Sequence, residues 1–204
     1  EIKKASPSKG ILKEIFDVSE IAKEYSAAGA TCISVLTDTP SFMGSKGDLG
    51  IARKSSPLPL LRKDFFIDPY QVFETKYLGG DCILIILSML SDSQARELYQ
   101  TAQEIELDSI FEVHNENEFE RALSMNAKLI GINNRNLHTF ETDIRTTVNL
   151  ASKFSDELII ISESGIYNST QIKMLQQKNV NAFLVGESII KSDNMTKTIQ
   201  DLLD

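Results

Sequence analysis

Four apolar runs of the chain each finish with a side chain that could take part in chemistry. The runs are short and continuous, as is typical of strands that are covered on both faces. In a parallel barrel all strands end on one face, so the side chains at these ends would converge on one pocket, where such barrels keep their active sites. The side chains are Lys63 at the end of 58–63, Glu112 in 109–113, Asn133 at the end of 129–133, and Glu163 and Ser164 at the end of 158–164.

Lys63 and Glu112 are the central pair of this prediction. A lysine in a dry pocket can donate a proton, with a pKa that responds to its neighbours, and a nearby carboxylate can accept one. The same two residues could instead form a structural salt bridge in the barrel mouth. Asn133 could hydrogen-bond a substrate oxygen or simply occupy a turn. Arg135 could orient Asn133, bind an anion or lie at the surface.

The first residues of the chain alternate in a way that would place two charges on one face. Glu1 and Lys3 flank Ile2, and alternate residues of a strand point the same way. Facing inward, they would bring a carboxylate and an ammonium group into the pocket. Otherwise the segment is a solvated chain end.

Two glycine-containing turns are candidates for a phosphate site. Ser164-Gly165 follows the seventh predicted strand and Gly186-Glu187-Ser188 follows the eighth, which is where barrels of this kind often bind phosphate. Glycines let backbone amides approach an anion closely, and a helix dipole assists. The alternative is that Gly165 and Gly186 merely turn the chain. If phosphate binds here, the Glu187 side chain must point away and leave its amide to bind.

Eight apolar, β-rich runs alternate with helical stretches along the chain. Repeated strand–helix units imply right-handed crossovers and closure into a (β/α)8 TIM barrel, with residues 1–204 as a single α/β domain. An open doubly wound sheet is the alternative, but its usual Gly-rich turn, GxGxxG, does not follow the first strand. The runs are the segment around Ile2 and the ranges 31–36, 58–61, 82–87, 109–113, 129–133, 158–162 and 182–186.

Helix signals lie between these runs, and the polar stretch 37–50 is predicted as the longest loop, which could cover the active site. The chain is shorter than the about 250 residues typical of such barrels and opens inside a predicted strand. We therefore expect that an N-terminal segment precedes Glu1 in the complete protein. The predicted helices are 18–28, one that opens at Asp68-Pro69 and closes at Gly79-Gly80, 91–105, 116–125, 143–154, 168–178 and 192–203.

The composition narrows the class of protein. The net charge of −8 argues against a nucleic-acid partner, and no apolar run reaches the about 18 residues that a membrane span needs. Cys32 and Cys82 fall in predicted core strands, so we expect two buried thiols in a reducing cytoplasm. His114 and His138 lie in predicted loops as surface or capping residues, and neither has the spacing of a metal site.

Eight segments, in order from one end of the chain to the other, resemble those of the indole-3-glycerol-phosphate synthase family. Any one of them is weak evidence, but together they are highly specific. Related barrels of the same pathway lack the combination of Lys63, Glu112 and the opening segment. The segments are EIKKASPSKG at 1–10, ISVLTD at 33–38, LRKDF at 61–65, IDPYQ at 67–71, EVHNE at 112–116, IGINNRNL at 130–137, SESGI at 162–166 and FLVGES at 183–188.

The resemblance implies a reaction that needs no cofactor or metal. The substrate would be 1-(2-carboxyphenylamino)-1-deoxyribulose 5-phosphate, whose aromatic ring attacks the ketone carbon before carbon dioxide and then water leave. Lys63 would activate the ketone and Glu112 would serve the dehydration, although the sequence does not decide which acts in each proton step. The resemblance assigns the reacting hydroxyls to Glu1 and Asn133, the carboxylate to Lys3, the phosphate to Ser6, Gly165, Gly186 and Glu187, the floor to Ser164 and Glu163, and the apolar wall to Phe65, Leu184 and Phe42.

The resemblance also implies a cytoplasmic enzyme, expected as a monomer that could associate with other enzymes of tryptophan biosynthesis, and a helix before the first strand that helps to cover the barrel. Two alternatives stay open. A sugar-phosphate isomerase on the same barrel would transfer protons without releasing carbon dioxide. A catalytically silent barrel kept as a binding partner would have no need of Lys63 and Glu112 together with Glu1 and Asn133.

Overall fold

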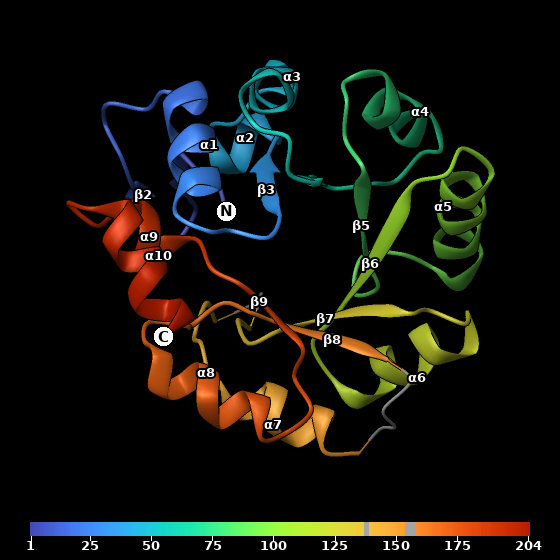
Figure 1. Ribbon diagram of the computed structural model, residues 1–204. Coiled ribbons are helices and arrows are strands. Elements are labelled where there is room, and N and C mark those ends of the chain that lie inside the picture. The colour runs from blue at the N-terminus through green and yellow to red at the C-terminus, as the bar shows by residue number, and fades with distance from the viewer. Residues whose placement is uncertain (137–138, 154–157) are drawn as a thin grey trace.

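The computed structural model describes residues 1–136, 139–153 and 158–204 (Figure 1). Seven parallel strands follow one another in chain order around one sheet, and each pairs with the next. Parallel neighbours need a crossover, and here each crossover contains at least one helix. The strands are β3 (Ile33–Leu36), β4 (Leu60–Lys63), β5 (Cys82–Ile86), β6 (Asp108–Val113), β7 (Leu129–Asn133), β8 (Ile159–Glu163) and β9 (Ala182–Leu184).

The first residues of the chain occupy the eighth position and close the ring. Ile2 bridges Val35 of β3 in parallel, and the backbone nitrogen of Glu1 donates to the carbonyl oxygen of Val185, just beyond β9, at 2.8 Å. The first predicted run is therefore one bridge rather than a full strand. With this segment the sheet is a nearly closed barrel, so the predicted (β/α)8 TIM barrel is confirmed.

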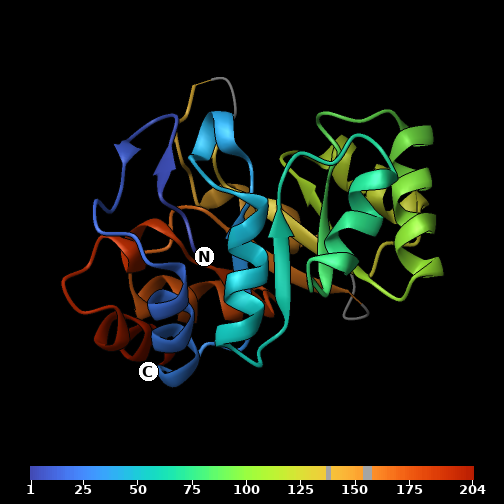
Figure 2. The same ribbon diagram turned by 90° about the horizontal axis from the view of Figure 1, so that it is seen from above.

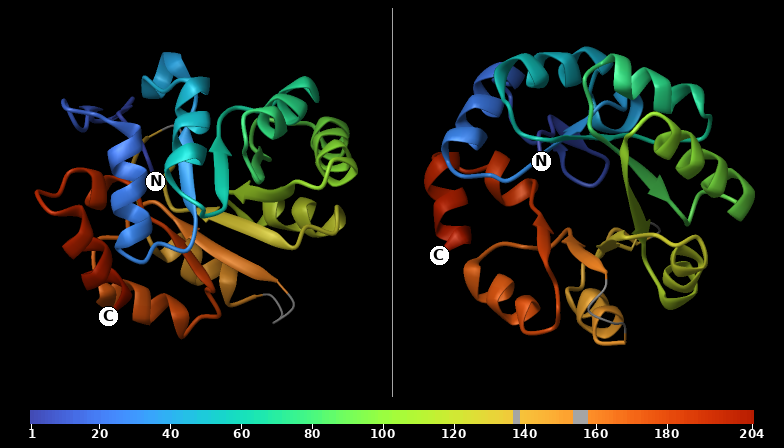
Figure 3. Two further views of the ribbon diagram at one scale, coloured as in Figure 1. Left: turned by 45° about the horizontal axis from the view of Figure 1, so that its top comes forward. Right: turned by 45° about the vertical axis from the view of Figure 1, so that its right-hand side comes forward.

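Helices surround the sheet as an outer layer, which the right panel of Figure 3 shows as a ring. A short antiparallel hairpin, β1 (Ala5–Ser6) with β2 (Gly10–Ile11), stands at one end of the barrel beside α2 (Figure 2). The helices are α1 (Val18–Ala27), α2 (Thr39–Phe42), α3 (Lys46–Ser55), α4 (Tyr70–Tyr77), α5 (Asp92–Glu104), α6 (Glu116–Ser124), α7 (Arg145–Ala151), α8 (Ser169–Gln176), α9 (Glu187–Ile190) and α10 (Met195–Leu203).

Side-chain caps explain where several helices begin. Asp17 accepts from the backbone of Ser19 and Glu20 at the start of α1, and Ser91 and Gln94 form a reciprocal capping box at the start of α5. At α4 the predicted start differs by one residue, because Pro69 takes the cap position while Asp68 accepts from the nitrogen of Tyr70.

The polar stretch 37–50 is not a loop, which corrects that prediction. It holds α2 and the start of α3, whose capping box joins Ser45 to Asp48. Only Leu49 and Ala52 of α3 are buried. The sequence of this helix therefore contains few apolar residues at the spacing that would predict a helix. The predicted helix 192–203 also begins later, as α10, and a separate short helix, α9, precedes it.

The two cysteines are less buried than predicted. Cys32 is exposed because β3 begins one residue after it, which leaves it in the connection from α1. Cys82 is partly buried at the first position of β5. The end of the predicted helix 143–154 and His138 lie outside the described residues.

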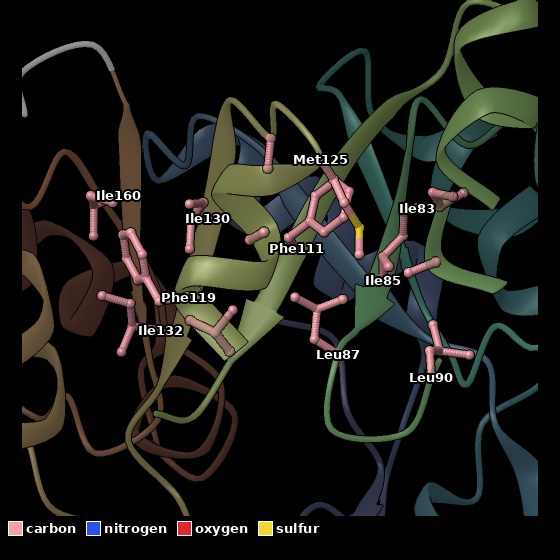
Figure 4. Close-up of a cluster of buried hydrophobic side chains, with 14 of the residues drawn as sticks. Ile83, Ile85, Leu87, Leu90, Phe111, Phe119, Met125, Ile130, Ile132 and Ile160 are labelled. Atoms are coloured by element: carbon pink, nitrogen blue, oxygen red, sulfur yellow. The ribbon is translucent and has the colours of Figure 1, made fainter. Parts of the chain in front are cut away.

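Apolar side chains form a core on each face of the sheet. Those that face the helices fill the outer layer, and Figure 4 shows Ile83, Ile85 and Phe111 among them. The alternate residues of the same strands, such as Leu84 and Ile110, fill the barrel interior. In the part of the chain that the structure describes, every helix is too short or too polar to cross a membrane.

Candidate active site

A pocket opens at the carboxyl ends of the barrel strands, as the sequence predicts. Its charged and amide lining comes from segments that are far apart in the chain and that the closed sheet brings together. The register places Asn133 opposite Glu163 on neighbouring strands. All fifteen residues predicted for the site line this pocket: Glu1, Lys3, Ser6, Phe42, Lys63, Phe65, Glu112, Asn133, Arg135, Glu163, Ser164, Gly165, Leu184, Gly186 and Glu187.

Lys63 lies at the centre of the charged wall and pairs with two carboxylates. Its Nζ is 2.6 Å from Oε2 of Glu163 and 3.3 Å from Oε2 of Glu112. Both carboxylates are almost fully buried, whereas the Lys63 side chain keeps 14% of its surface exposed. The sequence paired Lys63 with Glu112, but the shorter contact is to Glu163, which the sequence placed on the floor of the pocket.

Glu1 and Lys3 form the second ion pair of the wall. Nζ of Lys3 is 2.6 Å from Oε1 of Glu1, and both side chains line the pocket. Ile2 between them points the other way and is 1% exposed in the outer core. The predicted alternation of this segment is therefore confirmed.

Two of the carboxylates have opposite pKa shifts. Burial opposes ionisation of Glu112, but Lys63, His114 and Asn133 together lower its pKa to about 2. Burial raises the pKa of Glu163 to about 7, which Lys63 opposes and the neighbouring Glu112 reinforces. When the surroundings of two carboxyl groups move their pKa values apart in this way, one group can act as an acid and the other as a base.

Lys63 remains charged in this setting. Burial disfavours its ammonium form, but Glu163, Glu112 and Glu1 outweigh burial and raise its pKa well above the usual lysine value. Lys3 and Lys63 likewise outweigh the effect of burial on Glu1 and lower its pKa to about 2. The wall therefore holds ammonium groups against carboxylates, which suits charge that develops on a bound substrate.

Two glycines make room for these carboxylates. A Cβ at Gly131 in β7 would lie 2.1 Å from Oε1 of Glu163, and a Cβ at Gly186 would lie 2.5 Å from Oε1 of Glu1. Any side chain at either position would displace the carboxylate. Gly131 is not among the residues predicted for the site, although a glycine inside a strand run is a signal of close approach.

Asn133 is fixed from two sides. Its amide nitrogen donates to Oε1 of Glu112 at 3.1 Å, and its oxygen accepts the backbone N–H of Arg135 at 3.0 Å. The backbone N–H of Arg135 therefore helps to fix the orientation of Asn133, and a role for the Arg135 side chain stays a prediction. Its guanidinium lies 22% exposed, 3.7 Å from the Glu187 carboxylate and 3.3 Å from Oγ of Ser8.

The far side of the pocket is built from the turns after β8 and β9 and from the hairpin. Ser164 and Gly165 have consecutive positive φ angles of 66° and 76°, so the chain turns sharply after β8. The Glu187 side chain pairs with Arg135 at 3.7 Å and with Lys191 at 3.2 Å. Ser6 and Ser188 add hydroxyl groups to the lining.

Apolar side chains form the remaining wall. Phe65 follows β4 and packs against Phe42 of α2, with ring centroids 6.3 Å apart and planes tilted by 40°. Leu184 of β9 also lines the pocket, so the three predicted apolar residues all do so. The pocket has further apolar lining residues that the sequence does not predict, among them Leu36, Leu84, Ile86, Met89, Phe140, Ile166, Tyr167 and Val185.

His114 is not the surface residue that the sequence predicts. Its side chain is 13% exposed and lies between Glu112 and Glu118. It follows β6 directly, and Asn115, not His114, caps α6. Among the described residues, no group of three or more His, Cys, Asp or Glu side chains has an arrangement that could hold a metal ion.

Comparison with known proteins identifies the family of the chain. A family model for indole-3-glycerol phosphate synthase matches residues 1–202. An indole-3-glycerol phosphate synthase of Legionella pneumophila (strain Lens) is 48% identical over 203 residues, which are 100% of this chain and 79% of that protein. The chain belongs to the indole-3-glycerol phosphate synthase family. The enzymes of this family are carboxy-lyases of tryptophan biosynthesis, so the predicted resemblance is confirmed.

Further relatives agree with this assignment. An indole-3-glycerol phosphate synthase of Acinetobacter baumannii (strain ATCC 17978) is 49% identical over 192 residues, covering 94% of this chain and 72% of that protein. Two solved structures share the fold at low identity. A thiamine phosphate pyrophosphorylase from Pyrococcus furiosus has a TM-score of 0.67 at 14% identity and covers 91% of this chain and 87% of its own. A mandelate oxidase variant has a TM-score of 0.72 at 13% identity and covers 97% and 69%.

Proposed function

We propose that the pocket converts 1-(2-carboxyphenylamino)-1-deoxyribulose 5-phosphate to indole-3-glycerol phosphate, carbon dioxide and water, with Lys63 at the reacting ketone. The observation that carries this proposal is the position of the Lys63 ammonium. It lies between Glu163 and Glu112 in a pocket whose other wall is apolar and aromatic. An acid beside carboxylates serves the ketone, and an apolar wall suits the aromatic ring of the substrate.

Ring closure needs a proton at the ketone oxygen. When the aromatic carbon bonds to the ketone carbon, the C=O electron pair moves to oxygen and forms an alkoxide. The raised pKa of Lys63 keeps it protonated until that moment, and an alkoxide is basic enough to take its proton. The carboxyl group then leaves as carbon dioxide, and its bonding electrons restore the aromatic ring.

Dehydration needs a proton on the departing hydroxyl and removal of one from the substrate. We assign proton removal to Glu112, which its low pKa keeps ionised. We assign proton supply to Glu163, whose pKa of about 7 lets it hold a proton and pass it to Lys63 across the 2.6 Å contact. Overall one proton is consumed, and one molecule each of carbon dioxide and water is released.

The remaining lining residues would bind and orient the substrate. Lys3 would hold the carboxylate, while Glu1 and Asn133 would hydrogen-bond the reacting hydroxyl groups, as the sequence predicts. Ser6 and the turns at Gly165 and Gly186 line the same pocket and would hold the phosphate through hydroxyl and amide groups. Phe65, Leu184 and Phe42 would contact the aromatic ring.

The test is a steady-state fluorescence assay for indole-3-glycerol phosphate with the synthetic anilino-ribulose phosphate. We expect product from the wild type and a rate lower by about 100-fold or more from Glu112→Gln. Glu116→Gln is a matched control, because that carboxylate belongs to the first turn of α6, is 52% exposed and pairs with Lys153. Proton exchange without carbon dioxide release would favour the isomerase alternative, and a folded wild type without turnover would favour the silent barrel.

Phosphate binding can be tested separately. Inorganic phosphate should compete with the substrate and raise the apparent KM without changing kcat, because it would occupy only the turns at Gly165 and Gly186. An apparent KM that stays constant at high phosphate concentration would contradict this site. Potassium chloride at equal ionic strength separates binding of phosphate from general screening of charge.

We also propose that the chain acts as a cytoplasmic monomer, which other enzymes of the pathway could bind. The support is that one copy of the chain supplies the charged wall, the apolar wall and the turns. Light scattering during size-exclusion chromatography tests the monomer, and a dimer at assay concentration would contradict it.

A further inference from the structure

His114 lies between two carboxylates at the carboxyl end of β6. Its Nε2 is 3.4 Å from Oε1 of Glu112, and its Nδ1 is 3.1 Å from Oε2 of Glu118. The Nδ1 contact is a hydrogen bond, whereas the buried Nε2 lies close to the Glu112 carboxylate without hydrogen-bonding it. Ionised carboxylates only accept hydrogen bonds, so a positive charge on the ring is favoured by attraction to both.

Glu118 is itself fixed and buried. Its Oε2 accepts the backbone N–H of His114 at 2.8 Å, and its Oε1 accepts from the side-chain nitrogen of Asn115 at 2.7 Å. Asn115 in turn caps the nitrogen of Glu118 at the start of α6. The first turn of α6 therefore anchors the outer nitrogen of the ring.

The inner nitrogen faces Glu112, where two other donors already meet. Asn133 donates to Oε1 of Glu112, the oxygen nearest His114, and Lys63 pairs with Oε2. A cation on the side of Glu112 that faces away from Lys63 offsets part of the charge of this buried carboxylate and limits the directions in which it can turn.

We propose that His114 is a positioning residue, an imidazolium anchored by Glu118 that keeps Glu112 ionised and turned toward Lys63 and Asn133. The inference rests on the proposed role of Glu112. The charged groups that face the ring are Glu112 on β6 and Glu118 on α6, with Lys63 of β4 on the far side of Glu112. Burial opposes the charge, but hydrogen bonding and attraction to the two carboxylates raise the pKa of His114 to about 9.

The test compares kcat and KM from about pH 6 to about pH 10 for the wild type and two variants. The wild type should lose kcat as the pH rises past about 9, because the imidazolium loses its proton there. His114→Gln should lower kcat by about 10- to 100-fold, as loss of an orienting group does, change KM by less than about 3-fold and lack this alkaline limb.

Glu118→Gln keeps His114 and removes the charge that anchors it. Its alkaline limb should move to lower pH, and this variant keeps the proposal testable if His114→Gln folds poorly. The matched control is Glu116→Gln, whose carboxylate belongs to the same helical turn but pairs with Lys153 at 2.7 Å. Its pH profile should match that of the wild type.

The outcomes separate this inference from the proposed function. A wild-type rate and alkaline limb in His114→Gln, or an unmoved limb in Glu118→Gln, would overturn the role of His114. If Glu112→Gln is slow while His114→Gln is unaffected, this inference fails and the role of Glu112 stands. A wild-type rate in Glu112→Gln would overturn both.

Discussion

Arg62 and Lys63 are adjacent cations on β4 that belong to two different regions of the molecule. Arg62 points to the helix layer, is 0% exposed and donates to Asp64 and Glu74. Lys63 points into the barrel, remains partly exposed and faces carboxylates from other strands. Both are buried ion pairs, yet their surroundings differ in how completely each polar group is satisfied.

The Arg62 network is complete. Each guanidinium nitrogen has at least one acceptor, supplied by Thr37, Asp64, Gln71, Glu74 and Thr75. In the Lys63 group, Oε1 of Glu163 is buried without a hydrogen-bond partner among the described residues. Buried charges whose polar atoms all have partners stabilise the fold, whereas the Lys63 group has an unpaired oxygen that can still bind a substrate group.

Replacing Lys63 with arginine should have the largest effect on activity. Lys63→Arg keeps the charge but removes a group that can give up its proton, since an arginine stays protonated. We expect kcat to fall by about 10²- to 10⁴-fold, while the free energy of unfolding, measured by urea titration, changes by less than about 2 kcal/mol. A kcat within about tenfold of the wild type would show that charge, not proton transfer, is what the ketone needs.

Replacing Arg62 should have the opposite outcome. Arg62→Met leaves Asp64 without its cation and leaves Glu74 with Lys46 alone, so the free energy of unfolding should fall by about 3–5 kcal/mol. Urea titration measures this change, and kcat per folded molecule should stay within about tenfold of the wild type. A stable Arg62→Met protein that has lost its activity would reverse the assignment of the two regions.

We expect Glu163 to lower the stability of the folded protein at neutral pH, whereas Arg62 raises it. Its pKa is raised to about 7 in the folded protein, so its favourable contribution is present at low pH and is lost as the pH rises through about 7. Glu163→Gln should therefore gain stability relative to the wild type between about pH 5 and about pH 8, and lose about 100-fold in kcat. Thermal unfolding at both pH values checks the sign, and a relative loss of stability at the higher pH would contradict it.

Gly131→Ala should give the smallest effect of the series. The added methyl group would meet Oε1 of Glu163, so we expect a loss of about 1–3 kcal/mol in stability and a lower kcat as that carboxylate moves. Gly50→Ala, inside α3, is the matched control, because its methyl group would meet the backbone oxygen of Leu78 at an ordinary contact distance of 3.8 Å. It should be neutral or stabilise by up to about 1 kcal/mol. Equal effects of the two changes would show that Gly131 makes no special room.

Much of the barrel could be predicted from the sequence because its signals are local. Continuous apolar runs mark buried strands, caps such as Ser91 mark helix starts, and parallel strands must end on one face. Convergence of Lys63, Glu112 and Asn133 follows from that geometry. The helix α3 was missed because its polar surface hides a helix with few buried residues.

The pairing inside the pocket could not be predicted, because it depends on side-chain directions across the barrel. Lys63 and Glu163 are 100 positions apart in the chain, and their 2.6 Å contact follows from barrel closure. His114 looked like a loop residue because its partner Glu118 lies on the following helix. The space beside Gly131 likewise exists only once β7 and β8 pair.

The most direct test of the role of Lys63 is a single-turnover experiment with the Lys63→Ala protein. The fluorescence of indole-3-glycerol phosphate follows product formation, and urea titration gives the concentration of folded protein. We expect a folded barrel that binds the substrate and forms no detectable product in the time of many wild-type turnovers. Product formation at the wild-type rate by folded Lys63→Ala protein would contradict the role of Lys63 and the separation of the two regions.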